Sequence, residues 1–335
     1  MIEQLAAKHT GDILQYSMAH TPDHTSLVLV DDRSELSRLL ARAYKEQIPG
    51  AEVLDFYAME PEALIAKVRT LGAKDLLVLV QSASFRMESF RIRVDAMQRD
   101  VKVVEHSNLA RMTGPDAALY VDALAYDHVY YRTVGRALQA RLNRTSRTVV
   151  HSGAAKPLVY DSPFEEAKLN TGDFEGLKNV ASTFPIGEVF TESKDLEALN
   201  GEVRIFSFAN SDYLVEMAEN PITLVIEKGR VADVHDSVEG LDRVLEQIHA
   251  HEGEVWVREF GLGMNRAFSR DRSVNDVTAY ERVHGVHLSL GAKHGVYKKP
   301  NLRARDARFH VDVFVDTHRV VLDEVDIYFP NEWRG

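Results

Sequence analysis

The chain has 335 residues, of which 45% are hydrophobic and 27% are charged, as in an ordinary globular protein. Its formal net charge of -11 disfavours binding to nucleic acid, because phosphate groups repel an acidic surface unless a basic face is segregated. The absence of cysteine excludes disulfides, thiolate metal sites and thiol nucleophiles. No early apolar run is long enough for a signal peptide and no segment for a transmembrane helix, so we expect a cytoplasmic protein without a membrane partner.

Predicted strands and helices alternate over the first part of the chain, residues 1–148. Short apolar runs and helical spacing predict strands at 26–30, 51–56, 76–80 and 101–104, and helices after residue 32, at 61–71 and at 127–143. Asp32 and Glu35 form a capping-box pattern for the first of these helices. The alternation predicts a three-layer α/β domain, with a parallel sheet covered by helices on both faces.

This first domain lacks the glycines of a nucleotide site. The turn after the first predicted strand reads Val30-Asp31-Asp32-Arg33-Ser34, and no glycine is present there to cradle a phosphate group. We therefore expect a structural or oligomerising domain that holds no cofactor.

The pattern changes between residues 144 and 161, and from 149 to 335 it becomes rich in strands. The predicted strands are 203–208, 222–226, 231–234 and 255–259. Lys228-Gly229 forms a hairpin turn between two of them, and one amphipathic helix is expected at 241–251. We predict a C-terminal α+β domain, residues 149–335, that is rich in β-strands and binds metal.

His310 and Asp312 belong to a strand-like segment in which valines recur at every second position. Such alternation is expected where one face of a strand lies in an apolar core. His310 and Asp312 then share the opposite face, about 7 Å apart along the backbone, within reach of one metal ion or two neighbouring ones. The same pattern fits an ordinary half-exposed strand, so this pair alone does not distinguish the two interpretations.

His287 and Glu259 lie in two further strand-like segments. His287 shares a face with Ser289 and Gly291, small residues that leave room for a ligand, although a histidine bonded to the backbone fits as well. Glu259 is in phase with Val257 on an apolar face, where a carboxylate needs a cation or several hydrogen-bond donors to remain charged. A metal ion would meet that need, and so would an arginine or a glycine-rich turn.

Glu188 completes a set of five candidate ligands. It follows Pro185 and Gly187, which form a rigid entry that can aim a side chain, although a surface glutamate fits the same pattern. Two histidines and three carboxylates suit zinc, cobalt, manganese or ferrous iron. Five ligands exceed the need of one catalytic ion with an open position, and they suit two ions that share a bridging carboxylate.

Four motifs follow one another in this half of the chain. They are Pro-x-Gly-Glu-Val-Phe-Thr from Pro185, Glu-x-Gly-x-Gly-x-Asn from Glu259, His-Leu-Ser-Leu-Gly from His287 and His-Val-Asp from His310. In this order they resemble the thermophilic aminopeptidase T/S family, leucyl aminopeptidase-like enzymes with two metal ions. The resemblance covers the chain from Phe184 onwards by motif and implies a homodimer. The metal ligands that it implies are Glu188, Glu259, His287, His310 and Asp312.

One position departs from the family pattern. Seven residues after the ligand histidine the family carries a tyrosine thought to help stabilise the tetrahedral intermediate, and here that position is His294, with Tyr297 three residues later. A histidine can donate a hydrogen bond, shuttle a proton or bind metal in that place. With this resemblance we predict Glu259 as base or bridge and His294 as stabiliser of the oxyanion.

A second resemblance is to 2,5-dihydroxypyridine dioxygenase, a mononuclear ferrous enzyme of similar length that opens an aromatic ring. A histidine stands there where this chain has Glu259, and it completes an iron site of two histidines and one carboxylate. The retained glutamate favours the two-metal pattern. His287, His310 and Asp312 could nevertheless form an iron site by themselves.

A basic segment lies between the two histidine strands. Its members are Lys293, Lys298, Lys299, Arg303, Arg305 and Arg308. They predict either a solvated loop or a cationic clamp for a substrate carboxylate beside the metal site.

The sequence thus predicts a cytoplasmic metalloenzyme with one or two divalent ions, zinc, cobalt, manganese or iron, that hydrolyses a peptide or amide bond. The substrate would be a small molecule or a short peptide. The alternative is an Fe(II) ring-cleaving dioxygenase that acts on a hydroxylated pyridine or aromatic acid. A third interpretation is a descendant of the fold that binds a ligand without turnover.

Overall fold

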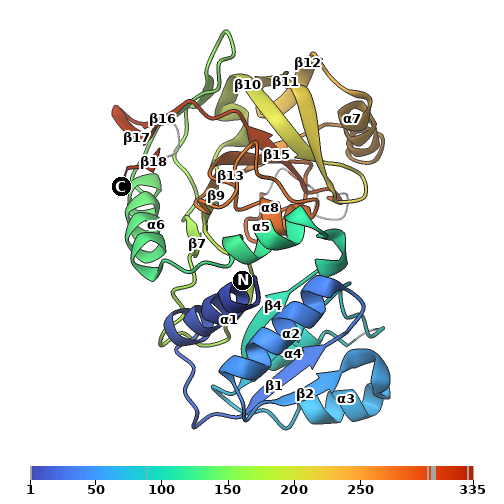
Figure 1. The fold of residues 1–335 in the computed structure, drawn as a ribbon. Coiled ribbons are helices and arrows are strands. Elements are labelled where there is room, and N and C mark those ends of the chain that lie inside the picture. The colour runs from blue at the N-terminus through green and yellow to red at the C-terminus, as the bar shows by residue number, and fades with distance from the viewer. Residues whose placement is uncertain (1, 89, 300–301, 303–306, 330–331, 335) are drawn as a thin grey trace. The chain divides into compact units, whose positions relative to one another are not determined.

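The computed structural model describes residues 2–88, 90–299, 302, 307–329 and 332–334 (Figure 1). The chain forms two compact units. The first comprises Met1–Tyr131 and Gly172–Ile186, and the second comprises Arg132–Thr171 and Gly187–Gly335. This division differs from the expected domains 1–148 and 149–335, because helix α6 (His128–Leu142) contains the first crossing and residues 172–186 return to the first unit.

The first unit contains a five-stranded sheet whose strands are all parallel, as predicted. In spatial order they are β2 (Glu52–Asp55), β1 (Ser26–Val30), β3 (Leu76–Val80), β4 (Lys102–His106) and β8 (Ala181–Thr183). Strand β8 comes from the returning segment and pairs with β4. Its short run of residues 181–183 carries no apolar repeat, so the sequence pattern did not indicate it.

Helices cover both faces of this sheet, which confirms the three-layer arrangement. Leu27 and Leu29 of β1 point to a core cluster that contains Leu64 of α3 (Pro61–Val68) and Ile92 of α4 (Ile92–Gln98). Val28, on the opposite face, is also fully buried. The remaining helices of the unit are α1 (Ile2–Asp12), the π-helix η1 (Ile13–Ser17), α2 (Glu35–Gln47), the short 3-10 helices η2 (Phe56–Ala58) and η3 (Leu109–Arg111), and α5 (Pro115–Ala123).

Helix α2 begins with a capping box, but not the predicted one. Ser34 is the N-cap, and its hydroxyl accepts a hydrogen bond from the Ser37 amide while the Ser34 amide donates to the Ser37 hydroxyl. The assignment of this box to Asp32 and Glu35 is wrong. Asp32 is exposed and lies two residues before the cap, too early for its carboxylate to serve the first turn.

The second unit contains an antiparallel sheet of thirteen strands within the described residues. Eleven of them run in the order β18 (Glu332–Trp333), β17 (Val325–Phe329), β16 (Arg319–Leu322), β5 (Thr148–His151), β6 (Leu158–Tyr160), β10 (Leu199–Ala209), β15 (Val311–Val315), β14 (Gly285–Leu290), β13 (Val257–Gly263), β9 (Glu188–Glu192) and β7 (Lys168–Asn170). The other two are β11 (Val215–Glu227), which pairs with β10, and β12 (Arg230–His235), which pairs with β11.

Several local predictions for this unit are confirmed. The hairpin turn at Lys228-Gly229 joins β11 to β12, and both turn residues have positive φ angles, as a tight hairpin requires. The predicted amphipathic helix is α7 (Glu239–Glu252), which buries Leu241 and Val244. The short helices η4 (Leu196–Ala198) and α8 (Val277–Tyr280) were not predicted.

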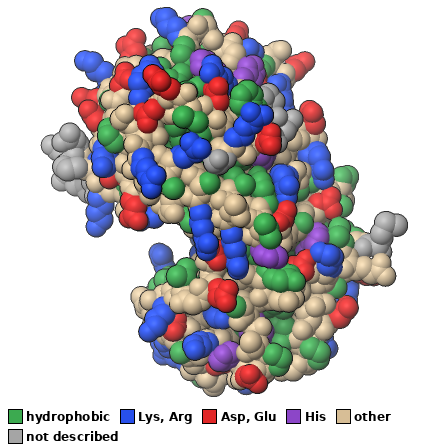
Figure 2. All heavy atoms as spheres, turned by 90° about the vertical axis from the view of Figure 1, so that its left-hand side faces the viewer, with side chains coloured by type: hydrophobic (Ala, Val, Ile, Leu, Met, Phe, Trp, Pro, Cys, Tyr) green, Lys and Arg blue, Asp and Glu red, His purple; other side chains and the backbone are tan. Residues whose placement is uncertain are grey.

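No helix among the described residues has the length and apolar character needed to cross a membrane. Figure 2 shows one face of the molecule, on which acidic and basic side chains are interspersed. The expectations about nucleic-acid and membrane partners stay predictions.

Candidate metal centre

Four of the five candidate ligands lie on four adjacent strands of the second unit. Glu188 begins β9, and Glu259, His287 and Asp312 lie within β13, β14 and β15. The pairing register places His287 opposite Gly261 and Glu188 opposite Gly263, so the strands bring distant parts of the chain side by side. His310, the fifth candidate, directly precedes β15.

The five side chains are close enough to form one cluster. His287 Nε2 lies 3.3 Å from Glu259 Oε1 and 4.0 Å from Glu188 Oε2. His310 Nε2 lies 3.2 Å from Asp312 Oδ1. Glu188, Glu259, His287 and Asp312 are buried, whereas His310 is half-buried. The structure therefore brings together all five residues that the motifs singled out, and their role as ligands stays a prediction.

A β-bulge aims Glu259 into this cluster. The pairing of β13 with β14 shifts by one residue between Val257 and Phe260, so the segment that contains Glu259 is one residue longer than its partner. Bulges of this kind re-aim side chains. The Glu259 amide donates to the Ser289 hydroxyl at 3.0 Å, which replaces the lost ladder hydrogen bond.

Gly261 provides the space that the His287 imidazole occupies. A Cβ atom at position 261 would lie 2.0 Å from His287 Nε2, far closer than two such atoms approach. Gly261 has no positive φ angle, so its backbone conformation does not explain the glycine. The motif Glu-x-Gly thus has a physical reason, because the carboxylate and the imidazole meet only where the intervening position lacks a side chain.

His310 has a defined orientation that suits a metal ligand. Its Nδ1 lies 3.2 Å from the Lys293 carbonyl, which can only accept a hydrogen bond, so Nδ1 carries a proton. Nε2 then faces the Asp312 carboxylate with a lone pair unless it is also protonated. Burial alone would lower the pKa of His310, but Asp312 and Glu259 raise that pKa to about 10. His310 Nε2 and Asp312 Oδ1 therefore need a cation between them, either a proton or a metal ion.

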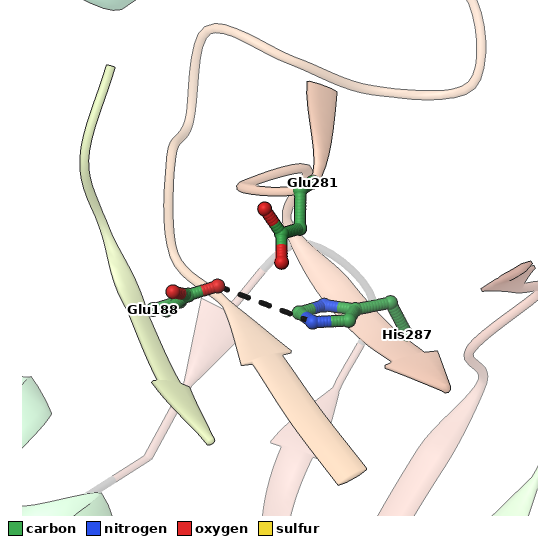
Figure 3. A group of neighbouring side chains, drawn as sticks. All are labelled: Glu188, Glu281 and His287. Atoms are coloured by element: carbon green, nitrogen blue, oxygen red, sulfur yellow. Dashed lines mark ion pairs between the residues drawn. The ribbon is translucent and has the colours of Figure 1, made fainter. Parts of the chain in front are cut away.

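Glu281 is a member of the cluster that the sequence motifs did not reveal. It follows α8 and lies within 4.8 Å of ligand atoms in two groups, Glu188 with His287 and Glu259 with His310. Figure 3 shows Glu188, Glu281 and His287 pointing toward one another from separate segments. Burial raises the pKa of Glu281 to about 8. The segment around it has no strand periodicity, so only its position six residues before His287 could have drawn attention to it.

Arg282 is the second residue that was missed. Its guanidinium is buried, lies 2.9 Å from Glu188 Oε2 and also contacts the Glu281 carboxylate. Among the described residues, Arg282 is the one arginine or lysine in ion-pairing distance of the carboxylates of Glu188, Glu259, Glu281 and Asp312. When both imidazoles are neutral and all four carboxylates are ionised, as metal ligation requires, one guanidinium leaves three negative charges in a buried space.

This charge and the donor set fit one or two divalent cations. Glu188 Oε2 and Asp312 Oδ1 are buried, and among the described residues they face the charged or titratable groups of Arg282 at 2.9 Å and His310 at 3.2 Å without a well-oriented hydrogen bond. Burial raises the pKa of Glu188, although Arg282 and His287 oppose that shift. A divalent ion would neutralise the excess negative charge and bind the oxygens of Glu188 and Asp312. Imidazole together with carboxylate suits zinc, cobalt, manganese or ferrous iron.

His294 presents a hydrogen-bond donor to the cluster. Its Nδ1 accepts a hydrogen bond from the Val296 amide at 3.1 Å, so the neutral ring carries its proton on Nε2. Nε2 lies 3.1 Å from Glu259 Oε2. Tyr297 does not take this place, because its hydroxyl donates to the Glu166 carbonyl at 2.6 Å. The arrangement is compatible with the predicted role of His294 as a donor.

Lys299 is the buried member of the predicted basic clamp among the described residues. Lys299 donates to the Glu165 carboxylate at 2.6 Å and its side chain is buried, so it is neither a solvated residue nor a free cation. Lys293 and Lys298 are exposed. Arg303 and Arg305 lie outside the described residues.

Comparisons with known proteins reveal likeness at the level of fold. No protein-family model matches the chain, and no curated protein matches it by sequence. The structure is similar to that of 2,5-dihydroxypyridine dioxygenase from Pseudomonas putida KT2440, with a TM-score of 0.66 and 14% identity over 100% of this chain and 98% of that chain. It is also similar to AmpT from Thermus thermophilus, with a TM-score of 0.59 and 15% identity over 99% of this chain and 100% of that chain.

Both resemblances that the motifs indicated are thus confirmed among the structural neighbours. The first neighbour is a dioxygenase and the second an aminopeptidase, so the two share a fold and differ in chemistry. The chain has the mixed α/β fold of these proteins, with a parallel sheet in the first unit and a strand-rich second unit.

Proposed function

We propose that the chain is a metal-dependent hydrolase that cleaves a peptide or amide bond in a short peptide or small molecule. One observation carries this proposal. Two overlapping groups of three ligands, Glu188 with His287 and Glu259 with His310, share Glu281 between them. A shared carboxylate between two ligand groups is the arrangement that a pair of metal ions needs.

The ligands would divide between these two groups. Glu188 and His287 would hold one ion, and Glu259, His310 and Asp312 would hold the other, with Glu281 within reach of both. Bound ions would polarise the scissile carbonyl and lower the pKa of a water molecule. We further propose that the enzyme is cytoplasmic and forms a homodimer.

Glu259 would serve as a metal ligand, and His294 would act on the reacting groups. Burial opposes the charge of Glu259, yet hydrogen bonds from His287 and His294 keep the pKa of Glu259 well below its usual range. A carboxylate held ionised in this way is a weak base, which favours the role of bridging ligand over that of general base. His294 carries its proton on the nitrogen that faces the cluster and would donate it in a hydrogen bond to the developing oxyanion.

A ring-cleaving dioxygenase with one ferrous ion is the second candidate. His287, His310 and Asp312 offer two imidazoles and one carboxylate, the donor set of such iron sites. The Pseudomonas dioxygenase also matches the whole chain with a TM-score of 0.66. A hydroxylated pyridine or aromatic acid would be the substrate.

Metal content and product analysis of anaerobically purified protein separate the two candidates. The hydrolase predicts about two ions per chain and release of amino acids from a panel of short peptides after loading with zinc, cobalt or manganese. The dioxygenase predicts one iron per chain and oxygen uptake with 2,5-dihydroxypyridine.

The variants Asp312→Asn and Asp326→Asn provide the matched comparison. Asp312 faces His310 in the cluster, while Asp326 is an aspartate of the same unit whose carboxylate pairs with Arg319 at 3.0 Å near the surface. Only Asp312→Asn should lose metal and activity. Metal binding without either reaction would contradict both candidates and leave ligand binding without turnover.

A further inference from the structure

We propose that Arg258 is a positioning residue that clamps the loop carrying His294. The His294 loop is defined as residues 292–299. This inference rests on the proposed function only in giving His294 a task at the metal centre. Nothing in the motifs singled out Arg258, which precedes Glu259 in the bulged part of β13.

The guanidinium of Arg258 reaches both sides of His294. One of its terminal nitrogens donates to the Ala292 carbonyl, and the other donates to the Tyr297 carbonyl at 3.2 Å. Its Nε donates to the Glu192 carboxylate. Arg258 is 3% exposed and Glu192 is fully buried, so water does not replace these contacts. The two carbonyls lie before and after His294, and one planar group therefore fixes the spacing between them.

Further contacts hold the ends of the same loop. The Glu252 carboxylate accepts a hydrogen bond from the Ala292 amide at 2.7 Å. Lys299 donates to Glu165 at 2.6 Å and to the Ser193 carbonyl at 2.7 Å. Between these anchors, the His294 ring accepts the Val296 amide and so is held within the loop. Arg258 joins the residues on both sides of His294 to the strand that bears Glu259, and the His294 ring itself contacts Glu259 at 3.1 Å.

The chemistry of arginine suits the three acceptors at this position. A guanidinium offers five donors in a fixed plane, and here three nitrogens serve three acceptors in three directions. Lysine would keep the charge beside Glu192 but could not reach both carbonyls in this geometry. A buried ion pair is weak evidence for stability by itself. The hydrogen bonds to the two carbonyls connect the ion pair of Arg258 and Glu192 to the loop and thereby hold His294 in position.

Hydrogen exchange of the whole protein tests the clamp without any need for activity. In Arg258→Lys, the backbone amides of residues 292–299 should exchange about tenfold faster than in the natural protein, while β14 stays protected. Arg230→Lys is the control, because the Arg230 guanidinium also forms ion pairs in this unit, with Glu197 at 2.9 Å and Glu254 at 2.8 Å, but does not contact the loop. Unchanged exchange in Arg258→Lys would overturn the inference.

A second variant guards against loss of folding. Glu192→Gln leaves Arg258 in place and removes the charge that orients it, while Lys299, which lies 4.0 Å from Glu192, keeps its shorter contact with Glu165 at 2.6 Å. If Arg258→Lys does not fold, Glu192→Gln should still raise exchange in the loop by about threefold, and an unchanged loop in that variant would overturn the clamp.

Activity then tests whether Arg258 acts through His294. Arg258→Lys should lower kcat about tenfold with little change in KM, and the double variant with His294→Ala should be no less active than His294→Ala alone, because the clamp has nothing left to position. A further tenfold loss in the double variant would show that Arg258 acts independently and would refute the proposal. If the natural protein neither hydrolyses peptides nor cleaves the aromatic ring, the proposed function is refuted. The hydrogen-exchange experiment would still test the clamp, because it does not depend on activity.

Discussion

The two units each bury a cluster of polar side chains, and the clusters differ in whether their hydrogen bonds are complete. In the first unit, Tyr44, His106 and Tyr120 are fully buried and bonded to one another. In the second unit, the buried cluster holds four carboxylates against one guanidinium, and Glu188 Oε2 and Asp312 Oδ1 make ion pairs without well-oriented hydrogen bonds. A complete network supports the fold, whereas carboxylates that lack well-oriented hydrogen bonds offer oxygens that can bind a cation.

The network of the first unit leaves no choice in its proton positions. Tyr120 donates its single hydroxyl proton to the Phe184 carbonyl at 2.9 Å, so His106 Nδ1 must donate to Tyr120. His106 Nε2 then accepts from Tyr44 at 2.8 Å. Every donor in this network of Tyr44, His106 and Tyr120 meets an acceptor. Burial keeps the His106 ring neutral by lowering the pKa of His106 to about 3. This network therefore needs no ion.

Removing a ligand from the incomplete cluster should have the largest effect. Asp312→Asn should weaken divalent metal binding by about 100-fold or more, since even partners outside the coordination shell contribute roughly 10–100-fold. Added zinc should raise the unfolding temperature of the natural protein and not that of the variant. Calorimetric titration and thermal unfolding measure the two effects. Equal affinity in Asp312→Asn and in the control Asp326→Asn would contradict the assignment of Asp312.

Filling the space beside His287 should have the next largest effect. Gly261→Ala places a methyl group 2.0 Å from His287 Nε2, so the imidazole or the strand must move. We expect a loss of about 1–3 kcal/mol in the free energy of unfolding, as for overpacked cores, together with weaker metal binding. Gly50→Ala is the control, because no atom lies within 4 Å of the added Cβ. Urea unfolding of both variants checks this, and equal losses would show that His287 does not require the glycine.

Breaking the complete network should destabilise the protein without affecting metal binding. Tyr44→Phe removes the donor to His106 Nε2 and leaves a buried acceptor unsatisfied. The expected cost is about 1–3 kcal/mol in the free energy of unfolding. Metal affinity measured on the same variant should be unchanged. A fall in metal affinity would remove the distinction between the two clusters.

The smallest expected effect is the pH dependence from His106 between pH 6.5 and 5.5, which amounts to about 1 kcal/mol. Its pKa is about 3 in the folded state against 6.5 in the unfolded chain, so the unfolded chain binds more protons as pH falls below 6.5. Stability should therefore decline between pH 6.5 and 3 by up to about 1.4 kcal/mol per pH unit from this residue. His106→Gln cannot titrate, and urea unfolding at pH 6.5 and 5.5 should show a shallower decline in it. The same slope in both proteins would contradict a buried neutral His106.

Much of the fold follows from local patterns. Short apolar runs predicted β1 and β3 at their observed bounds, because a strand covered on both faces is apolar throughout, and helical spacing predicted α7, which buries one face. The capping box of α2 was misplaced, since Ser34 and Asp32 both suit an N-cap and only the packed chain selects between them. The pairing of β8 with β4 joins residues about eighty positions apart, and no local pattern records such a contact.

The sequence by itself determined the residue types of the candidate metal centre and the strand-like segments that carry them, because strand periodicity shows which side chains share a face. Only the tertiary structure decided which further groups meet there. Glu281 and Arg282 come from a segment without periodicity, and the place of His294 depends on contacts with Arg258 across the sheet. Local patterns describe the direction of a side chain along its own segment, whereas burial, charge balance and proton positions arise where separate segments converge.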